Sequence, residues 1–190
     1  MIGGVSLLLG YVAGRPAHAQ VLEGTPIDAL RSSAEHGDAQ SQYALGRAYE
    51  DGLGVQADVK EAIKWYGKAA EQHLSVAQYV LGNILLHGEG GVAPDYAQAR
   101  KWLTTAAIAG IPAAQRDLGK MHEQGLGGEP DPIWAWVWYD FAANGGDGKA
   151  NGLRDELSRR LDSSALTEAK RLAADMAAKV APPPKQNQPQ

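Results

Sequence analysis

The sequence contains no cysteine among its 190 residues. A disulfide framework, a thiolate nucleophile and a cysteine-based zinc site are therefore excluded. Basic residues are also scarce, because 18 lysines and arginines face 22 aspartates and glutamates, which gives a formal net charge of −4. Proteins that bind nucleic acid usually present a basic surface that neutralises phosphates, so this balance argues against a nucleic-acid partner.

Sequence signatures of catalysis are missing as well. No glycine-rich stretch has the G-x-x-x-x-G-K-[ST] spacing of a phosphate-binding loop, and no serine lies in a G-x-S-x-G context. The histidines lack the H-E-x-x-H spacing of a zinc site; His36 and His73 are expected near helix ends, and His122 in the core. We therefore expect no metal, no cofactor and no enzymatic activity.

The two ends of the chain differ from the rest in composition. Residues 4–14 form an apolar run too short to span a bilayer, and Ala17-His18-Ala19 follows as an A-x-A pattern. This predicts a signal peptide over residues 1–19, cleaved after Ala19, and a periplasmic or secreted protein without a membrane span. No lysine or arginine precedes the run, so the true start codon stays open, and a buried N-terminal helix is the alternative. The Pro/Gln-rich residues 181–190 predict a disordered tail.

Between these ends the chain repeats itself. Residues 41–73, 77–110 and 114–146 can be aligned with a period of about 36 residues. The recurring positions are Leu45-Gly46, Leu81-Gly82 and Leu118-Gly119; the glycine pairs 52 and 54, 88 and 90, 125 and 127; Asp58, Asp95 and Asp131; and Trp65, Trp102 and Trp138. A fixed period of this length indicates a stacked repeat architecture.

Each copy reads as two helices. Small or apolar residues fall at 41, 45, 48 and 49, which is the spacing of one helical face. The glycine pair then ends this first helix, and Asp58 opens the second as its N-cap. The second helix carries small and aromatic residues on one side: Ala62, Trp65, Tyr66, Ala69 and Ala70. A lone helix pair cannot bury such a side, so the pattern predicts an all-α fold in which the pairs stack into an α/α solenoid.

The combined pattern A-x-x-x-L-G-x-x-Y, then G-x-G, then D-x-x-x-A-x-x-W-Y-x-x-A-A resembles the Sel-1-like repeat, a helical relative of the tetratricopeptide repeat. The first copy keeps nearly all of it, whereas Leu85, Leu103 and His122 replace tyrosines in the later copies. The resemblance implies three repeats over residues 38–147. We expect a partial repeat helix over residues 25–37 before them and capping helices over residues 148–180 after them.

The third copy is unusually rich in tryptophan. Trp138 is the repeat position and is expected in the core. Trp136 corresponds to Ile63 and Arg100, and Trp134 corresponds to Glu61 and Gln98, which should be exposed in the earlier copies. One interpretation packs Trp134 and Trp136 beneath an amphipathic helix over residues 163–180, which would cover the end of the solenoid. The other leaves them as an exposed aromatic patch that binds a partner or a sugar ring.

The function expected from the sequence is binding. First helices line the inner surface of such a solenoid, and their non-repeating residues are the natural specificity positions. These are Tyr43, Tyr79 and Arg116 at one position, and Arg47, Asn83 and Lys120 four residues on. We interpret them as a tyrosine-and-basic row that binds an extended segment of another protein, with an acidic segment as one option; ordinary helix surface is the alternative.

The resemblance implies the same class, because Sel-1-like proteins generally act as adaptors and scaffolds. We therefore expect a monomeric, non-enzymatic, bacterial adaptor. Two other functions stay open. One is a periplasmic module that binds peptidoglycan or polysaccharide through the aromatic residues. The other is an enzyme related to β-lactam chemistry, as linked to some cysteine-rich relatives, although this chain lacks the cysteines and a serine–lysine signature.

Overall fold

The computed structural model describes residues 27–179, and the signal peptide and the tail expected from the sequence lie outside them. Within this range the chain forms nine α-helices, one short 3-10 turn and no strand. The α-helices are α1 (Ile27–Glu35), α2 (Ala39–Asp51), α3 (Val59–Glu71), α4 (Ser75–His87), α5 (Tyr96–Ile108), α6 (Pro112–Gln124), α7 (Pro132–Asn144), α8 (Gly148–Arg160) and α9 (Ser163–Lys179); the turn is η2 (Glu89–Gly91).

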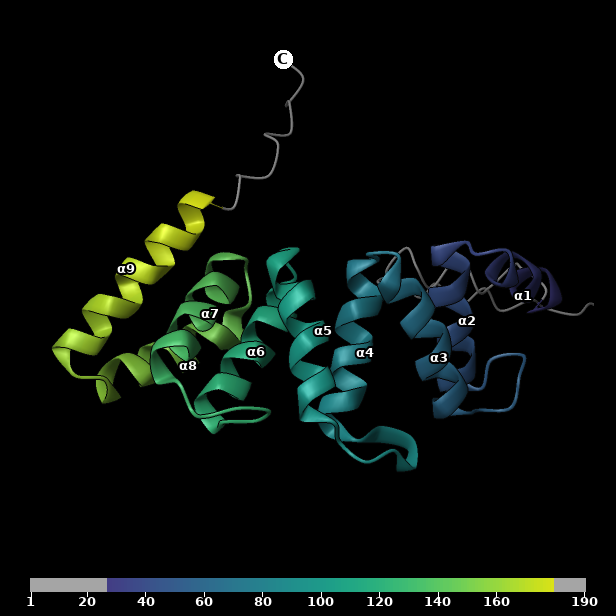
Figure 1. Ribbon diagram of the computed structural model, residues 1–190, viewed down its shortest axis with the longest axis horizontal. Coiled ribbons are helices and arrows are strands. Elements are labelled where there is room, and N and C mark those ends of the chain that lie inside the picture. The colour runs from purple at the N-terminus through teal and green to yellow at the C-terminus, as the bar shows by residue number, and fades with distance from the viewer. Residues whose placement is uncertain (1–26, 180–190) are drawn as a thin grey trace, which may run out of the picture.

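The helices follow one another in a row, with α9 crossing at the C-terminal end (Figure 1). The closest contacts are within the pairs α2/α3, α4/α5 and α6/α7, and each pair stacks on the next through α3/α4 and α5/α6. Helix α1 packs on α2, while α8 and α9 both pack on α7. The predicted solenoid of helical hairpins is therefore confirmed. None of the helices in residues 27–179 is long and apolar enough to cross a membrane.

Aspartates and glycines set the helix boundaries. The side chain of Asp58 accepts hydrogen bonds from the backbone N–H groups of Lys60 and Glu61, and Asp95 and Asp131 cap α5 and α7 in the same way. The first helices of the three repeats end at Gly52, Gly88 and Gly125, with φ of 69°, 71° and 70°. Since a left-handed backbone disfavours side chains, glycine ends each of these helices cleanly, as predicted.

The glycine of each Leu-Gly pair has a different reason, which is close packing inside the helix pair. A Cβ atom on Gly46 would lie 2.8 Å from the ring of Tyr66. On Gly82 it would lie 2.8 Å from Leu103, and on Gly119 it would lie 2.6 Å from Tyr139. The first helix thus presents bare backbone to the largest completely buried side chain of the second, and this contact recurs in every repeat.

A buried glutamine joins each repeat to the one before it. The side-chain Nε2 atoms of Gln42, Gln78 and Gln115 each donate a 3.0 Å hydrogen bond to a backbone carbonyl at the end of the preceding helix. The acceptors are Ala34, Ala70 and Ala107. Because Ala34 lies on α1, that helix takes the place of the second helix of an incomplete repeat. Each of these carbonyls also accepts a backbone N–H from the turn that follows its helix, so the glutamine supplies a second bond at the helix end.

The structure corrects the expected role of the repeat tryptophans. Trp65 and Trp102 are only half-buried, and lysine ammonium groups lie over their rings, with Lys68 Nζ 3.8 Å from the centroid of Trp65. Trp138 alone is buried. In each repeat the core position belongs to the next residue, so that Tyr66, Leu103 and Tyr139 are completely buried. The predicted stacking of the helix pairs is confirmed, but the completely buried side chain of each second helix is one residue further along than the tryptophan position.

The C-terminal helices cover the third repeat. Trp136 is buried against Leu157 of α8 and Ala169 of α9, and its indole N–H donates a 2.7 Å hydrogen bond to the hydroxyl of Ser158. Trp134 is partly buried, with its ring centroid 6.4 Å from that of Trp138. These contacts favour packing beneath the cap over an exposed aromatic patch. Trp136 is not available to stack on a sugar.

Candidate partner-binding face

The six residues expected to bind a partner lie on the first helices of the three repeats, and together they define the first-helix face. Tyr43 and Arg47 come from α2, Tyr79 and Asn83 from α4, and Arg116 and Lys120 from α6. The first four line one pocket of about 290 Å³ between α2 and α4, which we call the α2–α4 pocket. The structure therefore brings the predicted residues of the first two repeats together around a single hollow.

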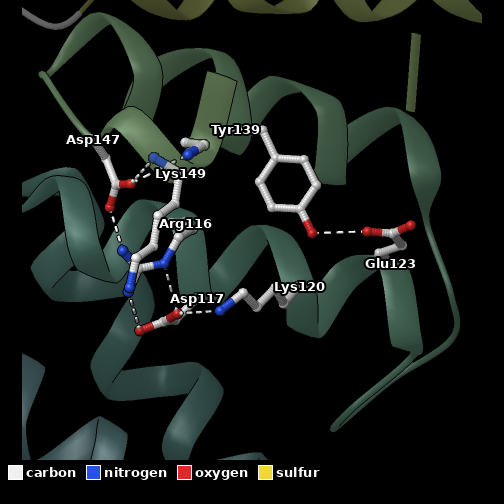
Figure 2. Close-up of polar contacts among 8 residues, drawn as sticks. Arg116, Asp117, Lys120, Glu123, Tyr139, Asp147 and Lys149 are labelled. Atoms are coloured by element: carbon white, nitrogen blue, oxygen red, sulfur yellow. Dashed lines mark hydrogen bonds and ion pairs between the residues drawn. The ribbon is translucent and has the colours of Figure 1, made fainter. Parts of the chain in front are cut away.

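The face continues from α4 to α6 through Tyr79. Burial raises the pKa of the Tyr79 hydroxyl. The neighbouring negative charge of Asp117 raises this pKa further, and the positive charge of Arg116 lowers it. These two residues are on α6, so the tyrosine bridges the second and third repeats. Arg116 in turn forms an ion pair with Asp147, the N-cap of α8 (Figure 2). The first-helix face is thus continuous along α2, α4 and α6.

Tyr43 departs from the expectation of a surface position. Only 5% of it is exposed, and its ring centroid lies 5.6 Å from that of Tyr66. Tyr66 is completely buried, and its hydroxyl donates a hydrogen bond to the Glu50 carboxylate. Burial raises the pKa of Tyr66 strongly, and the Glu50 carboxylate raises it further, so the phenol stays a donor. Tyr43 is therefore part of the core that forms the pocket wall.

The basic residues of the face are neutralised within the chain. Arg47 forms a 3.1 Å ion pair with Asp51, one helical turn along. Arg116 Nε lies 3.2 Å from Asp117, and Lys120 Nζ lies 3.1 Å from the same carboxylate (Figure 2). Three cations are thus matched by acids, and the expected basic row is a row of internal ion pairs. It provides no argument for an acidic partner.

Sequence reasoning missed the acidic half of this face. Glu50, Asp51 and Glu89 line the α2–α4 pocket beside Arg47. Asp117 is 4% exposed and takes the repeat position of Ala44 and Val80. A charged residue at a small or apolar repeat position was the available signal. In the pocket, Glu50 is such a residue, because the equivalent position of the second repeat holds Leu86, whereas Glu89 lies in the turn η2, outside the aligned helices.

A pair of residues in contact recurs in the repeats, and in the first repeat this pair lies beside the α2–α4 pocket. The Tyr66–Glu50 hydrogen bond of the first repeat returns in the third as Tyr139–Glu123, at 2.8 Å. In the second repeat the same two positions hold Leu103 and Leu86, both buried. A buried phenol needs an acceptor, whereas a buried leucine needs an apolar neighbour. Both members of the pair therefore change together, and the polar version is found beside the α2–α4 pocket.

Residues 27–179 contain no group of three or more histidine, aspartate or glutamate side chains arranged to hold a metal ion. His122 is half-buried, and its Nδ1 atom has no hydrogen-bond partner among the described residues. Burial lowers the pKa of His122, and the positive charge of Arg100 lowers it further. His122 is therefore only partly buried at this tyrosine position of the repeat, whereas a core position was expected.

Comparison with known proteins identifies this architecture. The family model described as Sel1 repeat matches residues 39–74, 75–111 and 112–147. The chain belongs to the Sel1 repeat family. Its three Sel1 repeats coincide with the helix pairs α2/α3, α4/α5 and α6/α7. Sel1 repeat proteins generally act in protein–protein interaction.

Two solved structures show the same Sel1 arrangement. A Sel1 repeat protein from Oxalobacter formigenes is 38% identical, with a TM-score of 0.60, over 67% of this chain and 95% of that one. A protective antigen of uropathogenic Escherichia coli strains that displays an SLR fold is 31% identical, with a TM-score of 0.54. That match covers 86% of this chain and 44% of the antigen.

Curated relatives with the repeat are larger proteins. Chitin synthase regulatory factor 3 of Schizosaccharomyces pombe is 38% identical over 139 residues, which are 72% of this chain but only 14% of the relative. DAP3-binding cell death enhancer 1 of Rattus norvegicus is 48% identical over 46 residues, 24% of this chain and 9% of the relative. This chain therefore spans only a small part of the length of these relatives.

Proposed function

We propose that this Sel1 repeat protein is a non-enzymatic adaptor that binds an extended segment of another protein along the first-helix face. The α2–α4 pocket is the observation that carries the proposal, because four of the six predicted residues converge on it. Family membership supports the class of function, and relatives named as a regulatory factor and a binding protein agree with it. The adaptor is proposed to act as a monomer.

The second part of the proposal concerns location. The apolar residues 4–14 and the Ala17-His18-Ala19 pattern support export to the periplasm or the medium of a bacterial host. Expression of the full chain, followed by cell fractionation and N-terminal sequencing, tests this part. Export is supported by a mature protein that begins at Gln20. A protein that stays in the cytoplasm with Met1 intact contradicts it.

Photocrosslinking in cells tests the binding face. A benzoylphenylalanine residue in place of Asn83, which lines the pocket and is half-buried, should capture a partner protein. The same residue in place of Lys64, exposed on the second helix α3, is the matched control. Capture at position 83 but not at position 64 supports the first-helix face, and equal or absent capture at both contradicts it.

Substitutions that leave the fold intact complete the test. Tyr43 is unsuitable because it is buried, so its removal would open the core as well as the face. Arg47→Ala removes a partly exposed ion pair with Asp51, which contributes about 0.5 kcal/mol or less. Arg47→Ala, in the chain that carries benzoylphenylalanine at position 83, should therefore change the yield of capture with almost no change in melting temperature. An unaltered yield would place the binding surface elsewhere.

A further inference from the structure

The α2–α4 pocket has the size and shape of a site for one side chain. Its volume of about 290 Å³ is at the lower limit of small-molecule pockets, which begin near 300 Å³. Helices α2 and α4 form its sides, and Glu89 of η2 borders it. Val80 and Ile84 add apolar surface to the lining. A long side chain with an apolar stem and a polar end would match this combination.

The charge of the pocket selects the polar end. Glu50, Asp51 and Glu89 line it, and Arg47 is the one basic residue of its lining, so the lining carries two net negative charges. Arg47 is already paired with Asp51, and Glu50 accepts a hydrogen bond from Tyr66. The Glu89 carboxylate forms no hydrogen bond or ion pair with any residue of the described range. The pocket therefore offers a cation one unused carboxylate beside two that are already held in place.

Two tyrosines strengthen the same preference. Tyr43 and Tyr79 line the pocket from the two opposing helices, at equivalent positions of successive repeats. Aromatic rings attract cations through the electron-rich faces of their π systems, and guanidinium groups do so most often. The Tyr43 ring is fixed by its contact with Tyr66, so the wall is already formed before a ligand arrives. Preformed walls lower the entropic cost of binding.

From these features we infer that the α2–α4 pocket binds a lysine or arginine side chain of the partner's extended segment. The inference rests on the proposed function and specifies its partner: the segment bears a basic residue opposite α2 and α4. The cationic end reaches Glu89 and the neighbouring carboxylates, while its methylene stem lies along Val80 and Ile84. The partner segment is therefore expected to carry a positive charge at this site, whereas the first-helix cations alone would suggest a negatively charged partner.

Small-molecule probes test the pocket without a known partner. The full chain, labelled with ¹⁵N, is titrated with N-acetyl-arginine amide and with N-acetyl-citrulline amide, which has almost the same shape but no charge. The arginine probe should shift the amide signals of Tyr79, Asn83 and Glu89, and 0.5 M salt should weaken the effect because exposed charges are screened. Equal shifts from the citrulline probe, or no shifts at these residues from either probe, would overturn the inference.

Charge substitutions at Glu89 assign the effect to the pocket. Glu89 is exposed on the short turn η2, so its replacement should leave the fold intact. Glu89→Gln should weaken the arginine probe by about threefold to fivefold, the range of an exposed ion pair, and Glu89→Lys should abolish its binding. Glu71→Lys makes the same change in charge at an exposed position outside the pocket lining and should bind normally. Unaltered binding by Glu89→Lys would contradict the site.

Capture from position 83 separates this inference from the proposed function. If a partner is captured and the Glu89→Lys change abolishes capture, both stand. If capture survives that change, the partner uses the face without the basic side chain, and only the inference fails. If the arginine probe binds but no protein is captured, the proposed function fails and the pocket's preference stands. Sedimentation that shows a dimer dissociated by Glu89→Lys would assign the pocket to a second copy and overturn the partner assignment.

Discussion

The close packing of Gly46 against Tyr66 makes the sign of a glycine-to-alanine change predictable. Alanine normally stabilises a helix by about 1 kcal/mol relative to glycine. At position 46, however, the added Cβ atom would lie 2.8 Å from two ring carbons of Tyr66, whereas carbon atoms prefer about 3.5–4.0 Å. Tyr66 is completely buried, and its hydroxyl is bonded to Glu50, so the ring has little room to withdraw.

Overpacking of this kind costs about 1–3 kcal/mol, which exceeds or cancels the helix gain. Gly46→Ala is therefore expected to be neutral or to destabilise by up to about 2 kcal/mol. Gly67→Ala, on the partner helix α3, is the matched control, because a Cβ atom there meets nothing within 4 Å. It should stabilise by about 1 kcal/mol.

Urea unfolding followed by circular dichroism at 222 nm measures both variants. Repeat arrays need not unfold in two states, so the transition midpoints of variants made in the same chain are compared. A Gly46→Ala midpoint that rises as far as that of Gly67→Ala would refute the packing argument. A second check is Gly46→Ala in a Tyr66→Ala background, where the clash is gone and alanine should stabilise; an unchanged penalty would be inconsistent with contact between the two residues.

Three further predictions concern other described residues. His73 has φ of 63° at the position where the other helix pairs have glycine, so His73→Gly should raise the thermal midpoint by an amount equivalent to about 1 kcal/mol or less. The pKa of half-buried His122 lies below its ordinary value of 6.5, so the unfolded chain binds a proton that the folded chain does not. Stability measured by urea unfolding should therefore fall as the pH drops below about 6.5, and His122→Leu should remove this dependence. Tyr139→Phe, which deprives Glu123 of a hydrogen bond, should lower stability by about 1.5–3 kcal/mol; calorimetry that shows no change would mean that the bond contributes nothing.

The repeat boundaries were readable from the sequence because their signals are local. An aspartate caps the helix that follows it, and a glycine with positive φ ends the helix that precedes it, whatever lies next to them. Asp58, Asp95 and Asp131 are N-caps as predicted, and Gly52 ends α2 as predicted. The period then fixed how the pairs stack. The overall fold needed no knowledge of distant contacts.

The sequence did not show which of two adjacent aromatic residues is the buried one. Trp65 and Tyr66 are both large and differ by about 100° around the helix, so either one could face the neighbouring helix. The deciding contact is with the bare backbone at Gly46, which lies 20 positions earlier in the chain. The rotation of one helix against the other settles which ring is buried. That rotation depends on the packing of both helices and not on the pattern of either one.

The charges of the binding face were misread for a related reason. Arg47, Arg116 and Lys120 recur at helical spacing and look like a basic row when the first helices are considered alone. Asp51 and Asp117 lie on the same helices as the cations that they pair with, but another acidic partner is remote: Asp147 is 31 residues beyond Arg116, at the N-cap of α8. An ion pair across repeats cannot be deduced from one repeat. The net charge of the face therefore required the stacking geometry.

The same repeat contacts also explain why one gap between first helices is a pocket and the next carries ion pairs. Gln78 and Gln115 anchor α4 and α6 by identical bonds to the preceding helices, so these first helices are mounted in equivalent ways. One of the differences between them is the side chain at the repeat position that holds Val80 on α4 and Asp117 on α6. Between α2 and α4, the uncharged Val80 leaves the carboxylates of the pocket available to a ligand. Between α4 and α6, Asp117 forms ion pairs with Arg116 and Lys120. Under the proposed function, the few residues that do not repeat would therefore determine recognition, while the repeating residues keep the spacing of the helices constant.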